Sequence, residues 1–119
     1  MEIKRGEVYS TNLIDKDSQG AEISKIRPAL VVQDDIWNKL LPSTIIVPLT
    51  SQMPGYISAG TVTLQQGAAG LEKDSNILFS QIRSVDKSRL VKKLGEVPAD
   101  KMRAANKALS LTLGLEPAD

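Results

Sequence analysis

The sequence contains no cysteine and no histidine among its 119 residues. Without cysteine there is no disulfide framework, no thiolate zinc site and no cysteine nucleophile. Without histidine, a Ser-His-Asp triad cannot be assembled, and a zinc site would need carboxylates alone. These two absences exclude most of the familiar hydrolytic and metal-dependent active sites.

Aromatic residues, net charge and long apolar runs are also scarce. Aromatic residues make up 3% of the chain, so any stacking of nucleobases on aromatic rings must be sparse. The 15 Lys and Arg residues nearly balance the 14 Asp and Glu residues, which gives no argument for duplex nucleic acid or an anionic membrane. No run approaches the roughly 18 apolar residues of a membrane span, and the N-terminus lacks a signal-peptide core. We therefore expect a cytoplasmic protein with no membrane partner.

Length and periodicity predict one domain that spans residues 1–119 and has a modest core, with 41% hydrophobic residues. Helical turns are expected at 34–42 and 85–90. Alternating patterns predict strands, in chain order, at 8–13, 29–33, 44–49, 61–64, 76–83 and 91–97. Strands at such short intervals favour a small antiparallel barrel over a doubly wound sheet.

One long helix is predicted after Pro98, which suits the first turn of a helix. Gly114 lies near its end, and one side of it carries Met102, Ala105, Leu109, Thr112 and Leu113. Within the predicted strand 44–49, Pro48 indicates an edge position or a bulge, because proline has no N–H to donate to a neighbouring strand. The fold class is therefore α+β and mainly β.

Arg27 stands directly before Pro28 and a run of four apolar residues, in the stretch KIRPALVVQ. Pro28 biases the backbone of Arg27 towards an extended conformation, so the guanidinium would be held at the entrance of a strand. A guanidinium held in this way offers a planar fork that suits a phosphate. Taken alone, a structural role is favoured, in which Arg27 covers the end of the barrel or pairs with a carboxylate such as Glu22.

The remaining polar motifs also have structural interpretations when each is taken alone. Thr50 and Ser51 end a predicted strand, where hydroxyl groups commonly stabilise turns. The acidic pairs in DKD (15–17) and DD (34–35) suit a solvated loop and a helix cap better than a metal site. QGAAG lacks the Lys-Ser/Thr that completes a phosphate-binding loop.

Several motifs occur together, in order, from about Lys4 to Leu115: KRGEVY, IRPALVVQDD, PSTIIVPLTSQ, GLEKDSNILFSQIRSVDKSRL and LGEVPADKM. Together they resemble the MazF/PemK family of toxin endoribonucleases of type II toxin-antitoxin systems. The resemblance implies a small SH3-like antiparallel barrel with a C-terminal α-helix. It also implies sequence-specific cleavage of single-stranded mRNA without a metal or other cofactor.

Two protein partners follow from the same resemblance. One is a second copy of the chain, because the family forms homodimers, and the apolar faces of TIIVPL (44–49) and of the C-terminal helix are the expected contact surfaces. The other is a cognate antitoxin, MazE/PemI-like, which wraps the dimer and blocks the groove for RNA.

The resemblance assigns catalytic roles to Arg27 of the RP motif, to Thr50 of the T-S motif and to Glu22 in the loop before Arg27. The family's EQGG motif in that loop is EISK here, and an acidic residue of some members is replaced by serine in FSQIRS. We expect RNA contacts from Lys25, Ser51, Gln52, Tyr56, Ser80 and Gln81. Tyr56 is either a stacking platform or a tyrosine of the core or a turn.

This chemistry suits a chain without histidine or cysteine, because RNA carries its own nucleophile, the 2′-hydroxyl group. The enzyme must align that oxygen with the phosphorus, stabilise charge on the phosphate oxygens and move protons. Arg27 would stabilise the charge, Thr50 would donate to a phosphate oxygen or orient the attack, and Glu22 could accept the 2′-hydroxyl proton. The expected products carry 2′,3′-cyclic phosphate and 5′-hydroxyl ends. Base choice is expected from the loops IDKDSQGAEISK and SQMPGYISAG.

Two other functions remain open at the level of the sequence. A CcdB-like toxin would share the fold but would bind and poison DNA gyrase without cleaving RNA, since fold alone does not settle function. Such a toxin leaves the motifs of Arg27 and Thr50 unexplained. The other alternative is a noncatalytic RNA-binding module, which only the altered EISK loop supports.

Overall fold

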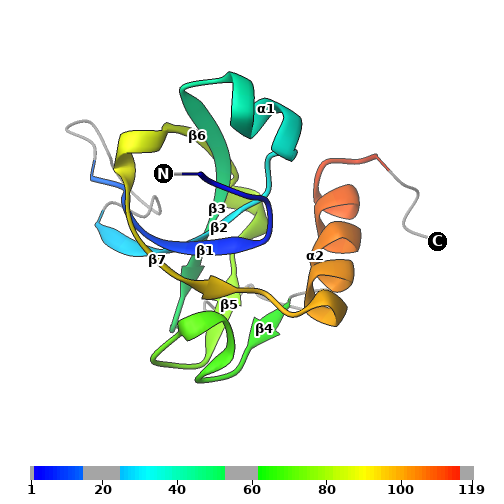
Figure 1. The fold of residues 1–119 in the computed structure, drawn as a ribbon. Coiled ribbons are helices and arrows are strands. Elements are labelled where there is room, and N and C mark those ends of the chain that lie inside the picture. Colours follow the sequence, from blue (N-terminus) through cyan, green and yellow to red (C-terminus); the bar gives the residue numbers. More distant parts are fainter. Residues whose placement is uncertain (1, 15–24, 53–61, 116–119) are drawn as a thin grey trace.

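The computed structural model describes residues 2–14, 25–52 and 62–115. Their strands form one curled antiparallel sheet in the order β4-β5-β3-β2-β1-β7, with β6 paired to β3 outside this path. The strands are β1 (Glu7–Asn12), β2 (Ile26–Val31), β3 (Ser43–Thr50), β4 (Thr63–Leu64), β5 (Ser75–Ile77), β6 (Arg83–Asp86) and β7 (Leu90–Glu96). Figure 1 shows the sheet curling around a core, with helix α2 (Ala99–Thr112) along one side. The predicted small antiparallel barrel with a C-terminal helix is confirmed.

Short helices connect several of the strands. Helix α1 (Asp35–Leu40) follows β2, and the 3₁₀ helices are η1 (Ala68–Gly70), η2 (Phe79–Gln81) and η3 (Lys87–Arg89). Asp34 caps α1, because its Oδ1 accepts a hydrogen bond from the backbone N–H of Ile36 at 2.9 Å. None of the helices in the described ranges is long and apolar enough to cross a membrane.

The second half of β2, Ala29–Val31, is buried on both faces of the sheet, to which successive side chains of a strand point in turn. Leu30 belongs to the larger core cluster, which also contains Ala105 and Leu109 of α2. Ala29 and Val31 belong to a second cluster on the other face. The central strands are therefore fixed from both sides, which gives their ends well-defined positions.

The predicted strand 76–83 is wrong as a single element. The chain leaves β5 at Leu78, whose φ and ψ are −94° and 79°, and turns through η2 before β6 begins. The backbone N–H of Gln81 donates to the carbonyl of Leu78 at 3.0 Å, which closes this turn. The two strands pair with different ends of β3, so this corner lets the sheet curl.

Of the two positions expected for Pro48, an edge strand or a bulge, the edge strand is wrong. Strand β3 is central, because β2 pairs with one side of it while β5 and β6 pair with the other. On that second side, β6 pairs up to Ile46 and β5 begins opposite Leu49. Pro48 thus lies at the change of partner strand, where a backbone donor is dispensable.

The two apolar surfaces predicted as dimer contacts differ in their exposure. In the stretch TIIVPL of β3, every residue except the half-buried Ile45 is buried within this chain, so the strand presents no exposed apolar face. In α2, Ala105, Ala108 and Leu109 are buried, whereas Thr112 and, directly after the helix, Leu113 are exposed. Leu113 lies outside the core cluster and lines a groove that also contains Trp37 of α1.

Candidate active site

The pairing of β2 with β3 brings Arg27 to Thr50. The register pairs Ala29 with Pro48, and its continuation by two residues places Arg27 opposite Thr50. The guanidinium of Arg27 donates from Nη1 to Thr50 Oγ1 at 3.1 Å. Thr50 Oγ1 also accepts from the backbone N–H of Gln52 at 3.2 Å. Since Thr50 is 4% exposed, it is a fixed support for the guanidinium.

Arg27 and Thr50 belong to a row of polar residues that crosses the sheet. Thr11 of β1 lies opposite Arg27, Asn76 of β5 lies opposite Thr50, and Thr63 of β4 lies opposite Asn76. Thr63 Oγ1 donates to Asn76 Oδ1 at 2.6 Å. Because directly opposed residues of antiparallel strands share a face, the row forms a continuous polar track.

The guanidinium of Arg27 keeps unused donor capacity. Its Nε atom is buried and has no hydrogen-bond partner among the described residues. A buried donor without a partner costs about 1–3 kcal/mol, so such groups are rare outside functional sites. The backbone therefore holds a cation whose donors are only partly satisfied by the described residues.

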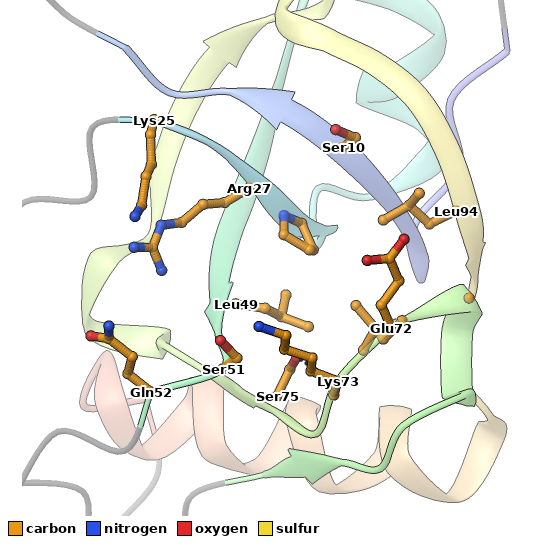
Figure 2. A pocket seen from close by; sticks show the side chains of 13 residues that line it. Ser10, Lys25, Arg27, Leu49, Ser51, Gln52, Glu72, Lys73, Ser75 and Leu94 are labelled. Carbon is orange, nitrogen blue, oxygen red and sulfur yellow. Dashed lines mark hydrogen bonds between the residues drawn. The ribbon is translucent and has the colours of Figure 1, made fainter.

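Arg27 lines a pocket of about 530 Å³, within the range of small-molecule sites. Figure 2 shows its lining, with Lys25, Arg27 and Gln52 at one end and Ser10, Glu72 and Leu94 at the other. Among the described residues, three cations and one carboxylate line it, which gives a positive balance. The lining residues are Ser10, Lys25, Arg27, Pro28, Leu49, Ser51, Gln52, Gly70, Leu71, Glu72, Lys73, Ser75 and Leu94.

One wall of this pocket depends on a close approach of two backbones. A Cβ atom on Gly70 would lie 2.0 Å from the carbonyl oxygen of Leu94, and one on Gly95 would lie 2.5 Å from the carbonyl carbon of Ala69. Gly70 also has a φ of +73°, which favours glycine. The two glycines let η1 touch β7, and this contact brings Leu94 and the residues after Gly70 to one pocket wall.

The sequence-predicted site residues fall into three groups. Arg27 and Thr50 are bonded to each other, and Lys25, Ser51 and Gln52 line the pocket beside Arg27. Ser80 and Gln81 lie in η2, which contacts β3 and α2, and they do not line this pocket. Glu22 and Tyr56 lie outside the described residues.

Sequence reasoning missed the residues at the other end of the pocket, namely Ser10, Glu72, Lys73 and Ser75. Glu72, Lys73 and Ser75 stand in the motif GLEKDSN, to which no role was assigned, and Ser10 had no sequence signal. Ser10 lies opposite Pro28 in the sheet, and Ser75 lies opposite Ser51 if the register of β3 and β5 is continued by one residue. These neighbours become visible only once the strand register is known.

Metal ligands are not clustered in the part of the chain that the structure describes. No group of three or more carboxylates there could hold a metal ion.

Comparisons with known proteins agree over nearly the whole chain. A family model described as "PemK-like, MazF-like toxin of type II toxin-antitoxin system" matches residues 4–113. Endoribonuclease MazF of Staphylococcus saprophyticus is 36% identical over 113 residues, which are 95% of this chain and 92% of that protein.

Solved structures give the same result. MazF from Deinococcus radiodurans superposes with a TM-score of 0.78 at 29% identity, covering 96% of this chain and 98% of that one. A chain of the MazE-MazF crystal structure (Form-II) from the same organism has a TM-score of 0.75 at 27% identity, covering 98% and 99%. The resemblance of the sequence motifs is thereby confirmed, and the chain belongs to the PemK-like, MazF-like family of toxins of type II toxin-antitoxin systems.

Proposed function

We propose that this chain, an endoribonuclease toxin of the PemK/MazF family, cleaves single-stranded mRNA at short specific sequences. The 2′-hydroxyl group of the RNA attacks the adjacent phosphate, and the products carry 2′,3′-cyclic phosphate and 5′-hydroxyl ends. The observation that carries the proposal is the guanidinium of Arg27, which Thr50 holds at a pocket lined by two further cations.

Arg27 stabilises the negative charge that builds on the nonbridging oxygens as the 2′-oxygen bonds to phosphorus and the bond to the 5′-oxygen breaks. Its planar fork can donate two hydrogen bonds to one phosphate, which Lys25 supplements as a point charge at the same end of the pocket. Alignment of the attacking oxygen supplies the rest of the rate enhancement.

Thr50 acts through Arg27. Its hydroxyl oxygen is nearly inaccessible and accepts the hydrogen bond from Nη1, so it fixes the plane of the guanidinium. The acceptor of the 2′-hydroxyl proton in this proposal is Glu22, which precedes β2 in the sequence, and the leaving 5′-oxygen takes up a proton from water as it departs.

In this proposal the RNA on either side of the cleaved bond contacts Lys25, Ser51 and Gln52, which line the pocket, Ser80 and Gln81 of η2, and Tyr56. No cofactor takes part in the reaction. A CcdB-like gyrase poison is not favoured, because it gives Arg27 no task and because the curated relative is named an endoribonuclease.

The active form in this proposal is a cytoplasmic homodimer that a MazE/PemI-like antitoxin neutralises. Relatives from Deinococcus radiodurans have been crystallised as MazE-MazF complexes, and this chain covers 98% or more of those MazF-like chains. That similarity supports an antitoxin of the same kind for this chain.

The test is cleavage of one mapped RNA by the purified protein in excess chelator. We expect cleavage to persist and the downstream fragment to accept a phosphate from polynucleotide kinase without prior phosphatase treatment. A single 2′-deoxy substitution at the cleaved position should block the reaction, while the same substitution several residues away should not. Loss of cleavage in chelator with recovery in magnesium would overturn the mechanism, as would cleavage at the 2′-deoxy position.

A further inference from the structure

The end of the pocket away from Arg27 has no task in the cleavage step. There the apolar side chains of Pro28, Leu49, Leu71 and Leu94 lie among polar groups from Ser10, Glu72, Lys73 and Ser75. Figure 2 shows Glu72 at this end beside Leu94, with Lys73 between it and the end that holds Arg27. Apolar walls with a few polar groups are typical of sites that bind a flat organic ring.

The charged groups at this end are not used by the fold. Within residues 2–14, 25–52 and 62–115, neither the Glu72 carboxylate nor the Lys73 ammonium has a hydrogen bond or ion pair with another residue. Lys73 takes part through its backbone carbonyl alone, which accepts from Ser75 Oγ at 3.0 Å. Both charged groups are therefore available to a ligand.

We propose that this end of the pocket binds a guanine base next to the cleaved phosphate, with Glu72 and Lys73 as the residues that select it. This proposal rests on the proposed function, because it names the base that the same site prefers. The sequence predicts base selectivity from the loops 14–25 and 51–60, whereas this proposal places base selectivity in the pocket.

Guanine is the base whose edge matches these two groups. Its N1–H and N2–H₂ are adjacent donors, and one carboxylate can accept from both. Its O6 acceptor lies beside them and suits the ammonium of a lysine. Adenine and cytosine offer one exocyclic amine next to an acceptor, and uracil offers one N–H between two acceptors. A carboxylate therefore gains a second hydrogen bond only with guanine.

The apolar residues contribute without reading sequence. Leu49, Leu71 and Leu94 can cover the faces of a base, which compensates for the scarcity of aromatic residues. Lys73 also lies between the carboxylate of Glu72 and the phosphate end, where it reduces repulsion between two negative groups.

The test is direct binding of nucleoside monophosphates to the full chain, followed by NMR shifts of backbone amides. The probes are the 3′- and 5′-monophosphates of guanosine, adenosine, cytidine and uridine. We expect one guanosine monophosphate to bind about 10- to 100-fold more tightly than the other bases, with shifts at Glu72 and Lys73. The series that shows this preference reveals on which side of the phosphate the guanine lies.

The decisive variant is Glu72→Gln, because glutamine keeps the shape but presents one acceptor and one donor, so it can no longer accept from both N1–H and N2–H₂ of guanine. We expect this variant to lose the guanine preference. Glu2→Gln, which changes an exposed carboxylate outside this pocket, is the matched control and should keep the preference. Thermal melts of both variants exclude unfolding as the cause.

Equal binding of all four bases by the wild-type chain would overturn the proposal, and so would a guanine preference that survives Glu72→Gln. The experiments test the guanine subsite separately from the cleavage mechanism. Guanine-selective binding that Glu72→Gln abolishes supports the subsite even if RNA is not cut. RNA cleavage with a base preference that Glu72→Gln leaves unchanged overturns the subsite and leaves the proposed function standing.

Discussion

In the proposed mechanism, Arg27 acts through its geometry as much as through its charge. Its Nη1 atom donates a hydrogen bond to Thr50, whereas its buried Nε atom has no partner among the described residues. A lysine would carry the same charge but could not make two parallel hydrogen bonds to a phosphate. The position therefore requires a guanidinium.

We expect Arg27→Ala to slow single-turnover cleavage of a defined RNA by about 10²- to 10³-fold, because one preorganised electrostatic donor is lost. Arg27→Lys should recover little of this loss. The thermal melting of both variants should stay close to that of the wild type, because a partly exposed polar contact contributes little to stability. A wild-type rate in Arg27→Ala would show that the active site is elsewhere.

Thr50→Val tests the support that Thr50 gives to Arg27. Valine keeps the shape of the side chain but cannot accept from Nη1, so cleavage should slow by less than in Arg27→Ala. The double variant should be no slower than Arg27→Ala alone, since Thr50 acts through that guanidinium. Multiplicative losses would instead indicate that Thr50 contacts the substrate independently.

Arg27 and Thr50 each stand in a short motif, so the family resemblance could assign them a role, and the structure places the two side chains in hydrogen-bonding contact. Glu72 and Lys73 could not be assigned in the same way. Their motif lies more than 20 residues beyond Thr50, and the sheet register that brings the two regions together has no local signal. Gln81 and Ser80 follow the same motif, yet the corner at Leu78 takes them out of the pocket.

At the scale of elements, the contact between η1 and β7 shapes the far wall of the pocket. Gly70 and Gly67 both have positive φ values, +73° and +92°. They differ in surroundings, because a Cβ on Gly70 would overlap the backbone of Leu94 whereas one on Gly67 would meet nothing within 4 Å. Comparing a substitution at Gly67 with one at Gly70 therefore separates the cost of steric overlap from the cost of backbone strain.

We expect Gly67→Ala to lower the free energy of unfolding by about 1–2 kcal/mol, which is the cost of a left-handed conformation for alanine. Gly70→Ala should cost about 1–3 kcal/mol more, because η1 must also move away from β7. Urea unfolding of the two variants measures the difference. Equal losses would show that the contact between η1 and β7 adjusts without cost.

Strands β1 and β7 are also joined by an ion pair between the buried carboxylate of Glu7 and the ammonium of Lys93. Glu7 Oε2 lies 2.7 Å from Lys93 Nζ, while Glu7 Oε1 accepts from the backbone N–H of Lys4 at 2.7 Å and from Tyr9 OH at 3.0 Å. Burial alone would raise the pKa of Glu7, but these partners outweigh it and lower the pKa below 4.5. Burial, reinforced by Glu7, raises the pKa of Tyr9 to about 12.

Glu7→Gln should lower the free energy of unfolding near pH 7 by about 1–3 kcal/mol, because glutamine has no charge and only one acceptor oxygen for the three donors of Lys4, Tyr9 and Lys93. In the wild type the lowered pKa gives stability that is present above pH 4.5 and is lost as the pH falls through the pKa of the folded state. The variant should therefore lose less stability on acidification than the wild type does. Urea unfolding at neutral and acidic pH provides the measurement.

The matched control is Glu96→Gln, which removes the exposed partner of the same lysine at 3.2 Å. Its effect should stay below about 1 kcal/mol, as is usual for exposed ion pairs. Equal acid sensitivity of Glu7→Gln and the wild type would show that another carboxylate dominates.

Element prediction succeeded where the local pattern decides the structure and failed where a partner strand decides it. The N-cap at Asp34 and the start of α2 after Pro98 follow from local chemistry. The split of 76–83 into β5, η2 and β6 does not follow from local chemistry, because it depends on β5 and β6 pairing with different ends of β3. Pro48 was the only residue in the sequence that indicated a missing backbone donor at this point. It was compatible with either an edge strand or a bulge.

At the scale of the whole molecule, the exposed apolar residues are not where the strand pattern placed them. Strand β3 is enclosed, whereas Trp37 of α1 and Leu113 and Leu115 at the end of α2 remain exposed and line one groove between the two helices. The C-terminal helix therefore remains a candidate surface for a homodimer, and the strand does not.

We expect sedimentation at micromolar concentration to report two chains for the wild-type protein. Leu113→Asp places a charge in the exposed apolar end of α2 and should shift the equilibrium towards single chains, because a charge buried in an apolar contact loses its hydration without a partner. Lys107→Asp, at an exposed position of the same helix, is the control and should leave the dimer intact.

If the active site needs residues of both copies, cleavage should fall together with the dimer as Leu113→Asp is diluted. A wild-type chain that sediments as a monomer and cleaves RNA at full rate would contradict the dimer, while dimers unaffected by Leu113→Asp would place the contact away from the end of α2.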